Sequence, residues 1–237
     1  MKVSSSRPLQ KMFMDVPPSY DFLNRLLTFR MDEVWRKKAA FVILSGAPER
    51  VLDLCTGTGD LALRLQRNAG KETVVFALDY SEPMLNQARK KASKKNLSNE
   101  NFFHGDAASM PFSDEYFDRV GIAFAFRNLT YKNPDTDKFL AEIVRVLKPG
   151  GLFVAVETSQ PGNALWRSLY HFYLRYITAP LGGLISGHRG AYKYLSWSAI
   201  NYYTSAELKM ILLEAGFSSV EYKNFMGGVA GLWIGKK

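Results

Sequence analysis

The strongest constraint on the fold is a glycine-rich segment at residues 50–61 that is followed at a fixed distance by an acidic residue. An apolar run, Val51 to Leu54, leads to Gly57 and Gly59, and a periodic apolar segment comes next. This order predicts a strand, a tight loop and a helix. Asp79 ends the next apolar run, twenty residues after Gly59, where nucleotide-binding α/β folds place a ribose-binding carboxylate. Glycine allows the backbone to approach a ligand closely, so the segment predicts a nucleoside cofactor site.

Two cofactors compete for this site. Gly57, Gly59 and Ala62 satisfy the loose dinucleotide fingerprint, which makes NAD a candidate. However, Asp60 stands at the helix start where a pyrophosphate would lie, and Asp53 precedes the loop. S-adenosylmethionine has a cationic sulfonium and an α-ammonium group and no phosphate, so the two acids favour it. Asp60 could also be an ordinary helix cap.

Length and composition indicate one soluble α/β domain. The chain has 237 residues, of which 47% are hydrophobic and 22% charged. We expect a single domain, 1–237, with an N-terminal helical cap (1–45) and an aromatic-basic substrate insertion (158–204). Residues 1–15 lack the apolar core of a signal peptide. With one cysteine, Cys55, and three histidines, we expect a cytoplasmic protein with neither a disulfide nor a metal site.

Apolar periodicity alternates between strand-like and helix-like segments along the chain. Strands are predicted at 50–54, 73–78, 101–104, within 117–126 and at 152–156, and a C-terminal hairpin at 219–225 and 229–235. Helices are predicted at 19–29, 32–45, 60–69, from 81 onward, 134–147 and 205–215. Such alternation implies a parallel sheet with ligands at the C-terminal ends of its strands. Asp53, Asp79, Asp106 and Arg127 all lie at such ends.

Positive charge is concentrated in two places, and the chain has a net charge of +9. The run Arg89 to Lys95 lies on a predicted helix, where we expect it to form a solvated face. The second place is the insertion, which has no Asp or Glu between Thr158 and Ala206 but is rich in aromatic and basic residues. It could stack nucleic-acid bases, receive an apolar ring and its lipid tail near an anionic surface, or simply form the core of a helical lid.

Four segments resemble the C-methyltransferases of the ubiquinone/menaquinone family. Tyr20-Asp21-x-Leu23-Asn24, with Thr28 and Trp35-Arg36, resembles their first signature, and residues 145–151 continuing through 157–159 resemble their second. Residues 126–128 and 191–195 also resemble family segments, so the likeness covers nearly the whole chain. The departures are Leu23 for Met, Thr28 for Ser, Asp32 for His and Ala123 for a Ser near the cofactor.

The resemblance implies a Rossmann-like class I methyltransferase with a mostly parallel seven-stranded sheet, a C-terminal antiparallel hairpin and a helical insertion lid. It also implies S-adenosylmethionine-dependent methylation of a ring carbon on a polyprenylated quinol, with demethylmenaquinol as the first substrate. A ubiquinone-pathway benzoquinol is the close alternative. An RNA or small-molecule methyltransferase and a non-enzymatic subunit of a quinone assembly are further alternatives. We expect peripheral contact with the inner face of a membrane and no nucleic acid, and the oligomeric state stays open, a homodimer included.

The resemblance also suggests roles for the strand-end residues. The cofactor-binding candidates are Asp53, Gly57, Thr58 and Gly59 at the methionine end, Asp79 at the ribose, Asp106 and Ala107 at the adenine, and Ala123. Arg127 would stabilise a developing oxyanion and Asn128 would position the ring or a water, although Arg127 could instead form a structural ion pair with a sheet-end acid. The substrate and lid candidates are Tyr20, Asp21, His188 and Tyr192, of which His188 could accept a proton.

Overall fold

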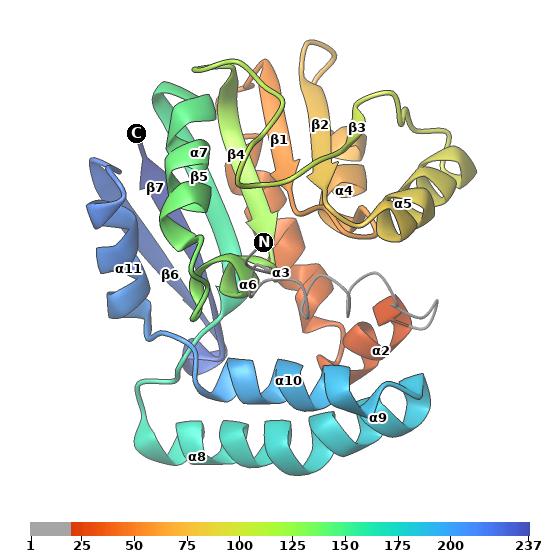
Figure 1. Cartoon of the computed structure of the whole chain (residues 1–237), viewed down its shortest axis with the longest axis vertical. Helices are drawn as coiled ribbons and strands as arrows, with labels where there is room; N and C mark the ends of the chain where they lie inside the picture. The colour runs from red at the N-terminus through yellow and green to blue at the C-terminus, as the bar shows by residue number, and fades with distance from the viewer. Residues whose placement is uncertain (1–19) are drawn as a thin grey trace, which may run out of the picture.

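A seven-stranded sheet forms the centre of the protein in the computed structural model, which describes residues 20–237 (Figure 1). The strands lie in the order β3-β2-β1-β4-β5-β7-β6. Their bounds are β1 Arg50–Leu54, β2 Val74–Asp79, β3 Phe102–His104, β4 Phe117–Ala123, β5 Leu147–Thr158, β6 Ser219–Phe225 and β7 Ala230–Lys236. The first five strands are parallel, whereas β7 runs antiparallel to both β5 and β6. The predicted sheet and its C-terminal hairpin are therefore confirmed.

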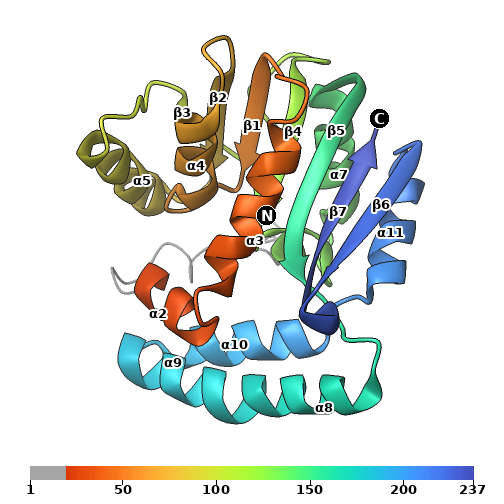
Figure 2. The same cartoon turned by 180° about the vertical axis from the view of Figure 1, so that it is seen from behind.

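Helices cover both faces of the sheet because alternate residues of each strand point to opposite sides. On β1, Leu52 and Leu54 join one apolar core, and Val51 joins the other. The helices on the first face are α6 Phe126–Thr130, α7 Thr136–Val146 and α11 Ser205–Glu214. On the second face they are α3 Met31–Ile43, α4 Asp60–Asn68 and α5 Glu82–Lys94, as the reverse view in Figure 2 shows for α3.

A further helical layer lies across the C-terminal ends of the strands (Figure 1). It consists of α8 Ala164–Tyr173, the π-helical turn η1 Leu174–Thr178, α9 Ala179–Ser186 and α10 Arg189–Ile200. Helix α2, Tyr20–Leu27, packs on this layer through Leu23 and Leu27, which contact the buried ring of Tyr192. A Cβ atom on Gly182 would lie 2.1 Å from that ring, so the packing requires glycine at this position. Within residues 20–237, no helix is both long enough and apolar enough to cross a bilayer.

Two local features differ from the sequence prediction. The strand expected within 117–126 is present as β4 and ends at Ala123, before Phe124 adopts a left-handed conformation (φ 60°), but residues 126–130 form the helix α6, which was not predicted. Strand β5 begins at Leu147 rather than at 152, and the pairing register with β4 shifts between Phe117 and Arg119. The segment 1–15, where a signal peptide was not expected, and the predicted helix start at Ser19 lie outside the described residues.

Candidate functional site

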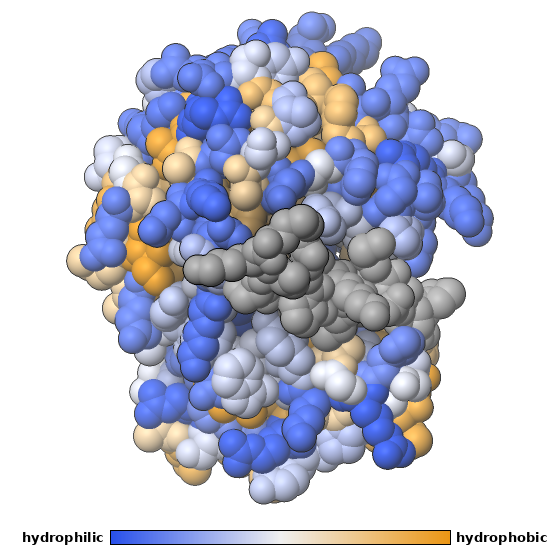
Figure 3. Space-filling model, in the orientation of Figure 1, coloured by the Kyte–Doolittle hydropathy of each residue, from blue (hydrophilic) through white to orange (hydrophobic). Residues whose placement is uncertain are grey.

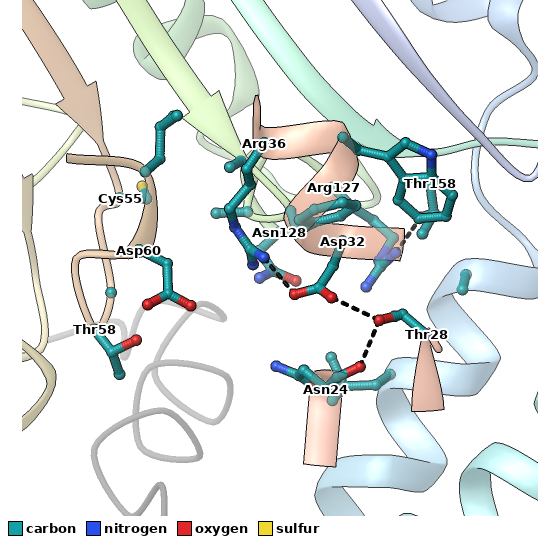
Figure 4. Close-up of a pocket in the computed structure, with 18 of the residues that line it drawn as sticks. Asn24, Thr28, Asp32, Arg36, Cys55, Thr58, Asp60, Arg127, Asn128 and Thr158 are labelled. Carbon is teal, nitrogen blue, oxygen red and sulfur yellow. Dashed lines mark hydrogen bonds and ion pairs between the residues drawn. The ribbon is translucent and has the colours of Figure 1, made fainter. Parts of the chain in front are cut away.

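A cavity of about 610 Å³ lies between the C-terminal ends of the strands and the helical layer. Loops that follow β1, β2, β3 and β4 form one wall, and α2, α3, α8 and α10 form the other. Figure 4 shows side chains from both walls converging on this space. The structure thus brings together charged strand-end residues and apolar side chains of the insertion.

Asp53, on β1, is the most buried acid of the strand-end wall, with 1% of its surface exposed. Its Oδ2 accepts hydrogen bonds from Thr56 Oγ1 at 2.6 Å and from the backbone N of Ala62 at 2.8 Å. Burial raises the pKa of Asp53 to about 7, although the hydrogen bonds and the charge of Arg36 act in the opposite direction. A cationic ligand in the cavity would favour the ionised form of this carboxyl group.

Asp79 ties the glycine loop to the end of β2. Its Oδ2 accepts a hydrogen bond from Gly57 N at 2.7 Å, and its Oδ1 accepts one from Ser81 N at 2.8 Å. Burial raises the pKa of Asp79, and these backbone donors lower it. Gly57 has φ 55°, and both residues line the cavity. Each carboxylate oxygen has a second lone pair with which it can accept a hydrogen bond from a ligand hydroxyl.

Gly59, unlike Gly57, is not among the residues that line the cavity, and its predicted ligand-binding role stays a prediction. It is buried, has φ 82° and caps the N-terminus of α4. A Cβ atom at this position would lie 2.8 Å from Ala88 Cβ on α5. The residue is glycine because α4 and α5 approach each other closely here, whereas Gly57 is the glycine that faces the ligand space.

The remaining strand-end candidates do line the cavity. Asp106 and Ala107 follow β3, and Asp106 Oδ1 accepts a hydrogen bond from Ala108 N at 2.9 Å, which shapes the turn. Ala123, the last residue of β4, lies on the same wall. The ends of four neighbouring strands therefore contribute to one surface, as the alternation of strands and helices predicted.

Lys91 joins α5 to Asp21 on α2 and to Asp60 at the start of α4, so the basic run on α5 is not simply a solvated face. Its Nζ lies 2.5 Å from Asp21 Oδ2 and 2.8 Å from Asp60 Oδ1, and it donates to Thr58 Oγ1 at 2.9 Å. Thr58 Oγ1 in turn donates to Asp21 Oδ1 at 2.8 Å. Asp60 is also paired with Arg25, at 3.1 Å.

This network bears on two candidate residues that line the cavity. Asp60 is paired with two cations of the protein itself, Arg25 and Lys91. The hydroxyl of Thr58 is hydrogen-bonded to Asp21 and Lys91, and its binding of the methionine end stays a prediction. Lys91 could have been found from the sequence, since it continues the buried positions Met84 and Ala88 at helical spacing.

A second polar cluster on the α2–α3 wall was not predicted as functional. Thr28 Oγ1 donates to Asp32 Oδ1 at 2.7 Å, and Arg36 Nη1 lies 2.5 Å from Asp32 Oδ2 (Figure 4). The Arg36 guanidinium also lies over the ring of Phe124, 4.9 Å from its centre. All these residues line the cavity, and Asp32 is buried. Thr28, Asp32 and Arg36 fall in the segment that resembles the first family signature, but the contacts among these side chains could not be predicted from that resemblance.

Arg127 and Asn128 begin the helix that follows β4, and both line the cavity. Arg127 is 6% exposed; its Nη1 lies 3.3 Å from Glu157 Oε1 and also donates to Thr158 Oγ1. Arg127 therefore forms an ion pair with Glu157, a sheet-end acid, as the alternative prediction for this residue stated. Among the described residues, Arg127 Nε and Asn128 Oδ1 are buried and have no hydrogen-bond partner. Because both residues line the cavity, these two atoms are available to a polar group of a ligand.

The residues predicted to form the lid or contact the substrate lie in different places. Asp21 belongs to the Lys91 network, and Tyr192 is buried and lines the cavity. Tyr20 begins α2, but its side chain lies outside the described residues. His188 is exposed at the N-terminus of α10 and is not part of the cavity lining, so its predicted contact with the substrate has no support in this cavity.

The wall opposite the strand ends is largely apolar. Its side chains come from α8, η1 and α10 and are Trp166, Leu169, Tyr170, Tyr173, Leu174 and Leu195. Within the described part of the chain, no group of three or more His, Cys, Asp or Glu side chains is placed to hold a metal ion. The cavity thus suits a polar, partly cationic ligand beside an apolar ring.

Comparison with known proteins agrees with this geometry. The model of the ubiE/COQ5 methyltransferase family matches residues 1–237. The chain is 44% identical over 226 residues to the demethylmenaquinone methyltransferase of Thermus thermophilus, covering 95% of this chain and 100% of the relative. It is 38% identical over 236 residues to the protein of that name from Deinococcus radiodurans, covering 100% and 95%.

Solved structures with lower identity share the fold. A SAM-dependent methyltransferase from Aquifex aeolicus is 22% identical, with a TM-score of 0.56 and coverage of 95% of this chain and 96% of that one. A putative methyltransferase from Bacillus halodurans is also 22% identical, with a TM-score of 0.60 and coverage of 85% and 98%. The predicted class I methyltransferase fold is therefore confirmed.

Proposed function

The chain belongs to the ubiE/COQ5 methyltransferase family, and we propose that it methylates a ring carbon of demethylmenaquinol, with S-adenosylmethionine as the methyl donor. Relatives that match nearly the full chain are named demethylmenaquinone methyltransferases, which favours the naphthoquinol over the benzoquinol. The observation that carries the proposal is the divided cavity, in which strand-end carboxylates face an apolar insertion wall.

The strand-end residues fit the cofactor. Asp79 can accept hydrogen bonds from ribose hydroxyls, and Asp106 with Ala107 can contact adenine. Asp53, whose carboxyl group gains charge when a cation approaches, suits the methionine end. Arg36, on the α2–α3 wall of the same cavity, can meet a carboxylate. S-adenosylmethionine, when bound, supplies an electrophilic methyl group on a positively charged sulfur.

The residues after β4 activate the acceptor ring in this proposal. Loss of a hydroxyl proton makes a quinol ring carbon more nucleophilic and leaves a negative oxygen. Arg127 stabilises that oxygen, because its guanidinium is held beside the cavity by Glu157 and can donate hydrogen bonds to it. Asn128 Oδ1, which lacks a partner in the described structure, accepts a hydrogen bond from a ring hydroxyl. The insertion wall excludes water and holds the ring in line for the transfer.

The substrate also implies a membrane. A polyprenylated quinol resides in lipid, so we propose that the protein contacts the membrane surface peripherally through its insertion. The insertion supports this, since it combines exposed apolar side chains with basic residues and has no acidic residue between Thr158 and Ala206.

The test is an anaerobic incubation of methyl-labelled S-adenosylmethionine with chemically reduced, short-chain demethylmenaquinone, followed by mass spectrometry of the lipid extract. We expect a product heavier by one methyl group, lost in Asp79→Ala and retained in Glu100→Ala, which removes an exposed acid outside the cavity. Parallel reactions contain a benzoquinol or RNA. Label in either of these and not in the naphthoquinol would overturn the substrate assignment.

A further inference from the structure

Helix α8 and the helical segments after it expose a long apolar stripe. Leu165, Leu169 and Phe172 are spaced by four and three residues, which places them on one face of α8. Tyr176 continues the stripe, since its ring centre lies 4.9 Å from that of Phe172, and Leu184 extends it on α9. These five side chains are between 51% and 71% exposed. A contiguous apolar surface of this kind indicates an interaction site.

Basic residues accompany this stripe. Arg167 and Arg175 belong to the same helical segment, and Arg189 and Lys193 lie on α10. No carboxylate occurs between Thr158 and Ala206 to balance them. Figure 3 shows separate orange apolar patches at the lower left and lower right of the molecule, among blue and white surface.

The charge pattern favours an anionic lipid leaflet over a second copy of this chain. A symmetric contact would place the same cations opposite one another, with no acid in residues 158–206 to pair with them. A leaflet with anionic headgroups instead complements them. Residues 164–186 are continuously helical and extend about 34 Å, which suits a helix that lies along a surface.

The cavity opens beside this stripe. Leu169 belongs to both the stripe and the cavity lining. Trp166 and Tyr173 also line the cavity, and each directly follows a residue of the stripe in the sequence, Leu165 and Phe172. Phe29, which is exposed and also lines the cavity, lies with its ring centre 6.1 Å from that of Tyr173. Trp166 Nε1 donates to Met226 O at 2.9 Å, which fixes the opposite side of the rim.

We propose that this rim is a lateral portal: the stripe rests on an anionic leaflet, the quinol ring enters the cavity past Phe29, Trp166 and Leu169, and the prenyl tail stays in the lipid. The proposal rests on the proposed function and specifies how its substrate arrives. A cavity of about 610 Å³ has the size of a site for one drug-sized ligand. Because the cofactor and the quinol ring share that volume, we expect the tail to stay outside.

The experiment compares two forms of the substrate. One is a short-chain demethylmenaquinol free in solution, and the other is a long-chain demethylmenaquinol embedded in phosphatidylglycerol vesicles. The double variant Phe172→Glu/Leu184→Glu changes the stripe without touching the cavity lining. The matched control, Phe41→Glu/Met210→Glu, changes exposed apolar residues on α3 and α11.

We expect the stripe variant to lose about tenfold or more of its turnover on vesicles and to stay within about twofold of the wild type on the free substrate. The control variant should match the wild type on both. Equal loss on both substrates, or no loss on vesicles, would overturn the docking surface. If the wild type methylates neither substrate, it is the proposed function that fails.

The portal itself is tested by the length of the tail. When the tail stays in the lipid, turnover at equal surface concentration in vesicles should vary by less than about twofold between four and nine prenyl units. A steep dependence on tail length would show that the protein takes up the tail, and would overturn the portal.

Discussion

Replacing Asp53 by asparagine should change how the stability of the ligand-free protein depends on pH. In the folded protein the pKa of Asp53 is about 7, against 3.8 as its ordinary value. Between these values the unfolded chain loses the proton and the folded protein keeps it. The free energy of unfolding therefore falls as pH rises through this window, by at most about 4 kcal/mol for the full pKa difference.

Most of this change occurs in an accessible range. Linkage gives a loss of about 2–3 kcal/mol between pH 5 and pH 8 from this group alone. Asparagine keeps an oxygen that can accept the hydrogen bonds from Thr56 and Ala62, but it binds no proton. The variant should therefore become more stable relative to the wild type by that amount as the pH increases.

Urea unfolding of both proteins at pH 5, 6, 7 and 8 measures this difference, since all other titrating groups are shared. The two proteins should have the same dependence on urea concentration, which shows that they expose the same surface. A difference in unfolding free energy that stays constant across this range would refute the argument, because Asp53 would then be ionised in the folded protein at every pH tested.

Three other changes test the packing and charge network. Gly59→Ala should lower the free energy of unfolding by about 1–3 kcal/mol, because the new Cβ would sit on a backbone with φ 82° and lie 2.8 Å from Ala88 on α5. Gly70 has open space around it, so Gly70→Ala should change the free energy of unfolding by less than about 0.5 kcal/mol. Equal effects of the two would contradict the packing role. Arg127→Met should lower the free energy of unfolding, measured in urea, by about 3–5 kcal/mol, because the buried carboxylate of Glu157 loses its cationic partner. Adding Glu157→Gln should recover part of this loss, and no recovery would argue against the ion pair. Lys91→Met should speed hydrogen exchange of the α2 amides and leave α7 unchanged, and unaltered exchange in α2 would show that the network does not hold this helix.

The sheet could be predicted from the sequence because strand periodicity and turn residues are local signals. The parallel order placed Asp53, Asp79, Asp106 and Arg127 at one edge, and the structure has them all in the cavity lining. The boundary of β4 could not be predicted, since it depends on the left-handed backbone at Phe124.

Features that depend on contacts between distant segments were not accessible in the same way. Gly57 and Gly59 look alike in the sequence, and their roles differ because Ala88 packs against one of them. The charge of Asp60 suggested a ligand, but Arg25 and Lys91 reach it from other helices. Pro180, Gly182 and Gly183 resemble turn residues in the sequence but lie inside α9, so the order of the insertion helices and the exposed place of His188 emerge from the folded structure.

The central claim, that the methyl group is transferred to a ring carbon, is tested most directly by the carbon NMR spectrum of the product made with ¹³C-methyl S-adenosylmethionine. The proposal predicts a single enriched resonance of a methyl group bound to an aromatic carbon of the naphthoquinol. An enriched methoxy resonance would show transfer to oxygen, and an unlabelled naphthoquinol recovered from protein that binds the cofactor would exclude this substrate.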